Sequence, residues 1–188
     1  FNEDGICSGC LIHEEKNKLD WKFRLNKLTK IVKNYKSKKL NYDCIVSIDG
    51  PDSYFVLHIV KNVLKLNPLA VSYNRYFNTE IGIRNQANLR IKFDLDLLVN
   101  NTNIESVRKI TKHTFQNYGN IYWPILAGST LFPIQIAVKY KIPLIIWGAH
   151  QGVEQVGMYS HTHEVEMSRR YRFDHDLFSV GPYSLAKF

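Results

Sequence analysis

The sequence predicts an α/β protein with a doubly wound, mainly parallel sheet, helices on both faces and a short N-terminal Cys-x-x-Cys segment. Short apolar runs alternate along the chain with stretches in which apolar residues recur at helical spacing. The runs occupy residues 44–48, 69–73, 95–99 and 142–147. Because strands buried on both faces read as continuous apolar runs, this alternation indicates a parallel sheet.

Helical patterns separate the four runs and predict the order β-α-β-α-β-α-α-β. They lie at residues 55–64, 81–91, 104–115 and 132–140. Asn67 and Pro68 end the first helix, and Thr102 or Asn103 caps the third. A further helix is expected from Asp20 to Tyr35, where apolar residues form a stripe and most lysines lie off it.

Composition indicates a globular protein, since 188 residues can bury one core. The net charge is +8, and many cations lie between Lys16 and Lys39. We interpret that segment as a solvated helix face, with a surface for an anionic partner as the alternative. The apolar runs are far shorter than the roughly 20 residues that span a bilayer, so no membrane segment is expected. Three cysteines do not suit a secreted disulfide framework, which favours a cytoplasmic location.

The loop at residues 48–53 (IDGPDS) is the first candidate for a ligand site. Ligands of doubly wound sheets bind beyond the carboxyl ends of the strands. Gly50 allows close approach of the backbone, Pro51 stiffens the turn, and Ser53 can cap or begin a helix whose free N–H groups attract phosphate. The same residue types also build a plain strand-to-helix turn, so the loop alone leaves both interpretations open.

The residues around this loop resemble a known family. Residues 42–47 (YDCIVS) and 50–53 (GPDS) resemble the strand and the Ser-Gly-Gly-x-Asp-Ser loop of the ATP pyrophosphatases, or PP-loop enzymes. More specifically, the chain resembles the N-acetyl sugar amidotransferases of lipopolysaccharide and nonulosonic-acid biosynthesis. That resemblance runs nearly end to end, through residues 4–10 (DGICSGC), 71–74 (VSYN), 121–124 (IYWP), 145–148 (IIWG) and 163–171 (HEVEMSRRY). It implies an adenine nucleotide alpha hydrolase-like fold.

The resemblance also implies a reaction. An ATP-dependent amidotransferase of this family converts an acetamido group of a UDP-linked N-acetyl sugar into an acetamidino group and releases AMP and pyrophosphate. ATP and Mg²⁺ are the implied cofactors. None of the three cysteines has a recognisable His partner, so ammonia is expected from a separate glutaminase subunit, for which residues 22–39 offer a docking face. Membrane and nucleic-acid partners are not expected.

Site residues follow from the same resemblance. Asp52 and Ser53 are the implied catalytic residues, and Asp52 is also a candidate Mg²⁺ ligand. The implied cofactor-binding residues are Asp49, Gly50, Asp52, Ser53, Ser72, Tyr73, Asn74 and Gly128. The implied substrate-binding residues are His150, Arg169 and Arg170. The alternatives are an ordinary strand-end turn for 72–74, a helix entry for Gly128, a structural role for His150 and a solvated helix end for the arginines.

The loop departs from the family pattern at two positions. Aligned without a gap, the leading Ser of the family falls on Ile48 and its first Gly on Asp49. A carboxylate at position 49 opposes phosphate unless Mg²⁺ bridges the two.

Cys7 and Cys10 supply two thiolates, whereas structural zinc takes four ligands. In the resembling family a second Cys-x-x-Cys lies upstream, so Zn²⁺ is expected for a longer protein, of which this chain, opening at Phe1 without Met, is a part. The expected organisation is a partial zinc knuckle at 1–19, a basic helix at 20–40, a nucleotide-binding domain at 41–150 and a substrate-facing segment at 151–188.

Two other functions remain open from the sequence. One is a PP-loop enzyme that modifies tRNA, which the basic helix and Cys-x-x-Cys would suit. The other is a non-catalytic subunit whose altered loop has lost ATP binding.

Overall fold

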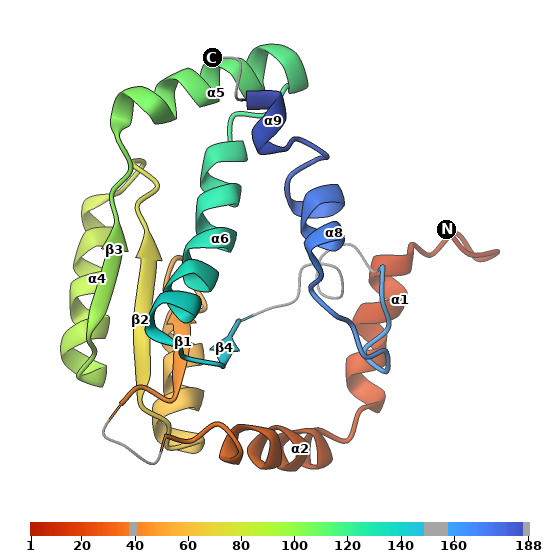
Figure 1. Ribbon diagram of the computed structural model, residues 1–188. Helices are drawn as coiled ribbons and strands as arrows, with labels where there is room; N and C mark the ends of the chain where they lie inside the picture. Colours follow the sequence, from red (N-terminus) through yellow and green to blue (C-terminus); the bar gives the residue numbers. More distant parts are fainter. Residues whose placement is uncertain (38–40, 149–157, 186–188) are drawn as a thin grey trace. The chain divides into compact units, whose positions relative to one another are not determined.

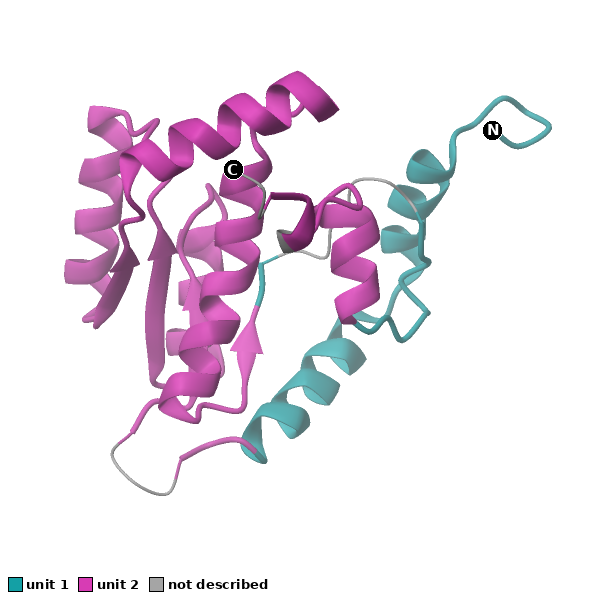
Figure 2. Cartoon of the chain, turned by 45° about the horizontal axis from the view of Figure 1, so that its top comes forward, with its two compact units in different colours: residues 1–34, 147–167 teal, residues 35–146, 168–188 magenta. Residues whose placement is uncertain are grey.

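The computed structural model describes residues 1–37, 41–148 and 158–185. The chain divides into two compact units (Figure 2). One unit contains residues 1–34 and 147–167, and the other contains residues 35–146 and 168–188.

The larger unit is built on a parallel four-stranded sheet, as the alternating pattern predicts. The strands are β1 (Cys44–Ser47), β2 (Pro68–Tyr73), β3 (Leu97–Asn100) and β4 (Ile145–Ile146), in the order β3-β2-β1-β4 (Figure 1). Every neighbouring pair is parallel, with Ile45 opposite Leu69 and Ile145. Strand order therefore reverses at β1, which has the earlier strands on one side and β4 on the other.

β4 is shorter than the apolar run at 142–147 suggests. Only Ile145 and Ile146 pair with β1. Pro143 has no N–H to donate to a ladder, so the strand begins after it.

Helices cover both faces of the sheet (Figure 1). They are α3 (Ser53–His58), which continues into the π-helical turn η2 (Ile59–Val63), α4 (Glu80–Phe93) and α6 (Trp123–Tyr140). A further helix, α5 (Ile104–Tyr118), contacts α6. Thr79 caps α4 and Asn103 caps α5, because each side-chain oxygen accepts a hydrogen bond from the first turn of its helix. The short helices α8 (Arg169–Tyr171), η3 (Arg172–Asp176) and α9 (Pro182–Leu185) follow at the C-terminal end.

α6 begins well before the residue at which the sequence pattern starts. Residues 132–140 were expected to be helical, but the helix already starts at Trp123 and has Pro124 in its first turn. Its Phe132 and Ile136 pack on Ile45 and Val71 of the sheet and form the main core. Burial of these side chains, at about 25 cal/mol per Å² of apolar surface, holds α6 on the sheet.

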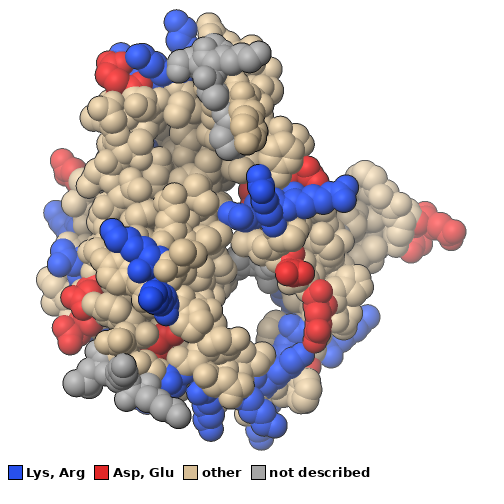
Figure 3. Space-filling view, viewed as in Figure 1, with Lys and Arg blue, Asp and Glu red and all other residues tan. Residues whose placement is uncertain are grey.

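The smaller unit contains α1 (Ser8–Glu15), the 3₁₀ turn η1 (Lys16–Lys18) and α2 (Trp21–Lys33). The Asp20 carboxylate caps α2 by accepting a 2.8 Å hydrogen bond from Phe23 N. Lys and Arg side chains line this helix (Figure 3), as expected for the basic segment. Of its apolar stripe, only Val32 is buried.

Residues 158–167 belong to this smaller unit. The Glu15 carboxylate accepts hydrogen bonds from Ser160 Oγ (2.8 Å) and His161 N (3.0 Å), and these bonds hold the pKa of Glu15 below its usual value. Lys27 pairs with Glu164 at 3.1 Å. This segment is thus tied to α1 and α2.

Among the described residues, no single helix is long and apolar enough to cross a membrane. α5 and α6 reach that composition only as a pair, and the chain bends by 119° between them.

Candidate functional site

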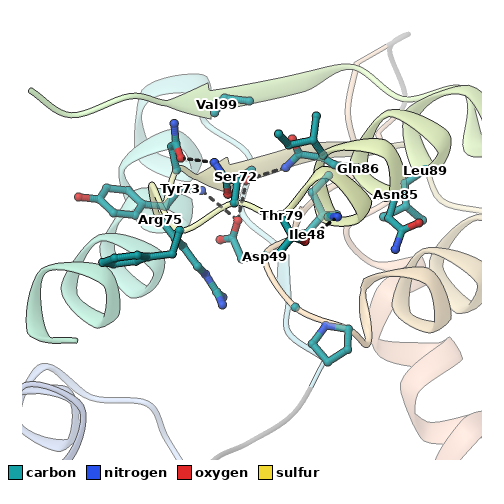
Figure 4. A pocket seen from close by; sticks show the side chains of 17 residues that line it. Ile48, Asp49, Ser72, Tyr73, Arg75, Thr79, Asn85, Gln86, Leu89 and Val99 are labelled. Carbon is teal, nitrogen blue, oxygen red and sulfur yellow. Dashed lines mark hydrogen bonds between the residues drawn. The ribbon is translucent and has the colours of Figure 1, made fainter. Parts of the chain in front are cut away.

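A cavity of about 360 Å³ lies at the carboxyl ends of β1 and β2 (Figure 4). Its walls come from the loop at 48–51, from residues at and after the end of β2 between Ser72 and Thr79, from one face of α4, and from Val99 of β3. This is the strand-end cavity. It lies where ligands of doubly wound sheets bind, and the loop that the sequence singles out forms part of its wall.

Asp49 is the carboxylate that organises this cavity. Its Oδ1 accepts hydrogen bonds from Ser72 Oγ (2.7 Å) and Tyr73 N (3.0 Å), and its Oδ2 accepts one from Ser47 Oγ (2.9 Å). Both oxygens are therefore occupied by donors from the ends of β1 and β2. The expected conflict with phosphate is smaller than a free carboxylate would cause, because these donors partly offset the charge.

Gln86 of α4 extends this network, and the sequence did not single it out. Its Nε2 donates a 2.9 Å hydrogen bond to Ser72 Oγ (Figure 4). Since the Ser72 hydroxyl gives its proton to Asp49, it can only accept from Gln86, which fixes the amide with its nitrogen toward Ser72. Gln86 lines the cavity. In the sequence, Gln86 is only an amide side chain on the helix that follows the second strand. That pattern is too common to identify a site residue.

The loop residues divide into two groups. Gly50 and Pro51 line the strand-end cavity, whereas Ser53 is buried and its hydroxyl donates to Gly50 O at 2.5 Å. The Ser53 side chain thus closes the loop, and it does not face the cavity as its implied pyrophosphate-binding role requires. Asp52 is exposed and makes no capping hydrogen bond to α3.

No protein contact explains the glycine at position 50. A Cβ placed there would meet no atom within 4 Å. Close approach of a ligand to the loop backbone at Gly50 stays a prediction from the sequence.

Gly128 packs against the ring of Tyr73, and its cofactor-binding role stays a prediction. It lies inside α6, so the expectation of a helix entry is wrong. A Cβ at this position would lie 2.2 Å from the ring of Tyr73, so the glycine makes room for that ring. Gly128 is not among the residues that line the strand-end cavity.

Asn74 lines the cavity and shapes the loop after β2. Its Oδ1 accepts hydrogen bonds of 2.9 Å from Tyr76 N and from Asn78 Nδ2, and its Nδ2 donates to Asn101. Ser72, Tyr73 and Asn74, proposed from the sequence as one group, do meet at the cavity. Among the described residues that line it, Arg75 is the one cation, and the sequence did not single it out.

The expected substrate-binding residues do not join this cavity. Arg169 and Arg170 lie in α8, and Arg170 is 92% exposed and pairs with Asp174 at 3.5 Å. Neither arginine lines the cavity. His150 lies outside the described residues.

The donor sets for metals are incomplete. Cys7 and Cys10 lie with their sulfur atoms 3.3 Å apart. Among the described residues, no group of three or more His, Cys, Asp or Glu side chains could hold a metal ion, so the pair is at most half of a structural zinc site. Mg²⁺ needs fewer protein ligands, since one carboxylate and substrate phosphates suffice. Asp52 is exposed and does not line the strand-end cavity, and its role as a Mg²⁺ ligand stays a prediction.

The strand order and the strand-end cavity define an α/β protein with the adenine nucleotide alpha hydrolase-like fold. Among solved structures, the chain is similar to the NH3-dependent NAD synthetase from Campylobacter jejuni subsp. jejuni NCTC 11168, determined in complex with the nitrate ion. The TM-score is 0.52 at 14% sequence identity, and the match covers 76% of this chain and 62% of that chain. The chain matches no family model, and no curated protein matches it.

Proposed function

We propose that the chain is an ATP-dependent amidotransferase that converts an acetamido group of a nucleotide-linked sugar into an acetamidino group, in surface polysaccharide biosynthesis in the cytoplasm. Ammonia would come from a partner glutaminase. The observation that carries the proposal is the strand-end cavity, which places Asp49, Gly50 and Ser72 at the carboxyl ends of two parallel strands. The fold shared with an NH3-dependent synthetase and the sequence resemblance support it.

The chemistry needs two steps. The amide oxygen of the acetamido group attacks the α-phosphorus of ATP, the bond to the β-phosphate breaks, and pyrophosphate leaves. Ammonia then adds to the activated carbon, a proton is lost, and AMP leaves with the former amide oxygen. Positioning and charge neutralisation supply most of the acceleration of such transfers.

The residues of this chain would act mainly by positioning. Gly50 lets the loop backbone approach the phosphates, and the hydrogen bonds of Asp49 hold the ends of β1 and β2 in a fixed relation. Asp52 would hold Mg²⁺, which neutralises charge on the phosphates when bound. Arg75 supplies a positive charge at the cavity wall.

The test is pyrophosphate release from ATP with ammonium salts and a panel of UDP-linked N-acetyl sugars. We expect release that depends on both a sugar and ammonium, and that falls at least about tenfold in Asp52→Asn, because a Mg²⁺ ligand is lost. Glu3→Gln is the control, since Glu3 is exposed and lies outside the lining of the cavity.

Two results would overturn this proposal. Pyrophosphate release with tRNA but with no sugar would identify a tRNA-modifying enzyme. No heat on titration of a folded chain with MgATP would identify a non-catalytic subunit.

A further inference from the structure

A second cavity, of about 650 Å³, lies beside α5 in the larger unit. Its walls are α5, residues 75–77 after β2, and the segment that leads into α6. We call it the α5 cavity. Its volume lies within the range of about 300–1,000 Å³ that is typical of small-molecule sites.

One wall of the α5 cavity is apolar and exposed. Ile104, Val107 and Phe115 form a stripe along α5 at helical spacing, and Ile121 continues it. Phe115 is 58% exposed, and Phe77, which follows β2, is 78% exposed. Exposed aromatic rings that line a cavity offer stacking surfaces for a flat ring.

Cations surround this apolar wall. Arg75, Arg108, Lys109 and Lys112 all line the α5 cavity. Glu105 is the one carboxylate among the described lining residues, and it pairs with Arg108 at 3.3 Å. The cavity therefore favours an anion, and Arg108 and Lys112 lie one helical turn apart on the same side of α5.

The two cavities share a wall. Arg75 and Phe77 line both the strand-end cavity and the α5 cavity. Tyr76, between them, has a left-handed backbone (φ 61°), which a tyrosine seldom adopts. Its N–H donates to Asn74 and its hydroxyl donates to Thr102 O, so contacts on both sides hold this conformation.

Resting on the proposed function, we infer that the α5 cavity binds the nucleoside diphosphate part of the acceptor substrate. The base would lie against Phe77 and Phe115, and the phosphates would meet Arg75, Arg108 and Lys112. The acceptor's sugar would then extend past the shared wall toward ATP in the strand-end cavity.

A small anion suits this cavity better than an acidic protein segment does. Arg75 lines both cavities, so an anion bound at its guanidinium lies beside the strand-end cavity as well. The guanidinium fork also matches phosphate oxygens in geometry.

The test is isothermal titration with UDP, in the presence of a saturating non-hydrolysable ATP analogue. UDP is compared with uridine, which lacks the phosphates, and with inorganic pyrophosphate, which lacks the base. We expect UDP to bind while the ATP analogue is bound, and to bind more tightly than uridine or pyrophosphate does. Loss of a charge-assisted contact in Lys112→Gln should weaken UDP about tenfold, and loss of stacking in Phe115→Ser about fivefold.

Matched controls are Lys139→Gln and Ile91→Ser, which change exposed side chains that line neither cavity. They should bind UDP as the parent chain does. Displacement of UDP by the ATP analogue, or UDP affinity unchanged in Lys112→Gln and Phe115→Ser, would overturn the inference. So would binding of an acidic amphipathic peptide to these residues with no UDP binding. Failure of the analogue to bind while UDP binds would instead overturn the proposed function.

Discussion

The hydroxyl of Ser72 donates a 2.7 Å hydrogen bond to the carboxylate of Asp49, and this bond joins the ends of two neighbouring strands. The same oxygen accepts from Tyr73 N, and Ser72 also accepts from Gln86 of α4. The carboxylate that departs from the PP-loop pattern is thus part of the framework of the strand-end cavity. Removing the Asp49 carboxylate and neutralising its charge should therefore differ in their effects on stability and on MgATP binding.

Asp49→Ala should destabilise the fold by about 1–3 kcal/mol, because it leaves Ser72 Oγ and Tyr73 N without their acceptor. Asp49→Asn keeps an oxygen for these donors, so its stability should stay within about 0.5 kcal/mol of the parent. It should also bind MgATP at least as tightly, since a negative charge is lost near the phosphates. Urea unfolding and calorimetric titration measure both quantities. Weaker binding of MgATP by folded Asp49→Asn would show that the charge itself assists binding.

A pair of glycine variants separates packing from ligand approach. Gly128→Ala should cost about 1–3 kcal/mol, because its Cβ would lie 2.2 Å from the Tyr73 ring and overpack the contact. Gly50→Ala places its Cβ in open space, so stability should change by less than about 0.5 kcal/mol. MgATP affinity should nevertheless fall severalfold in Gly50→Ala, because the loop backbone can no longer approach the phosphates. Unchanged affinity would contradict that role of Gly50.

The three cysteines should react with iodoacetamide in a set order. A hydrogen bond from the Cys10 backbone N–H holds the pKa of Cys7 below its usual value, whereas the hydrogen bond with Cys7 raises the pKa of Cys10. Burial, and then the charge of Asp43, raises the pKa of Cys44 to about 12. Because the thiolate is the nucleophile, Cys7 should react first, Cys10 second and Cys44 only after unfolding. Peptide mass spectrometry over time measures this order, and early labelling of Cys44 would be inconsistent with its burial.

Tyr42 should make stability depend on pH at the alkaline end. Its hydroxyl donates a 2.6 Å hydrogen bond to Asp96, and this bond, with burial, raises the pKa of Tyr42 to about 12. The pKa of tyrosine in the unfolded chain is about 10. The stabilisation that this hydrogen bond gives the folded protein is therefore fully present below pH 10 and is lost as the pH rises toward 12.

Tyr42→Phe removes the ionisable group and should cost about 1 kcal/mol at neutral pH. The loss of stability between pH 10 and 12 should be smaller in this variant than in the parent. Denaturant unfolding as a function of pH measures the difference. If the two proteins lost the same stability between pH 10 and 12, groups other than Tyr42 would be responsible for that loss.

The sequence alone supported much of the local structure. The apolar runs and helical patterns placed β1, β2 and α4 close to their observed positions, because periodicity reports which face of an element is buried. The sequence pattern did not reveal that α6 begins at Trp123. The small residues from Gly128 onward resemble a helix entry, yet this glycine is mid-helix, where Tyr73 packs on it.

The sequence by itself determined the α/β class and the position of the loop at 48–53, since both follow from the order of local patterns along the chain. Only the tertiary structure decided the strand order, the contact of Asp49 with Ser72 and the shared wall at Arg75. Asp49 and Ser72 lie 23 residues apart, and they meet because β1 and β2 pair in one register. Spacing along a chain encodes which side of an element is buried, whereas packing and register decide which elements meet.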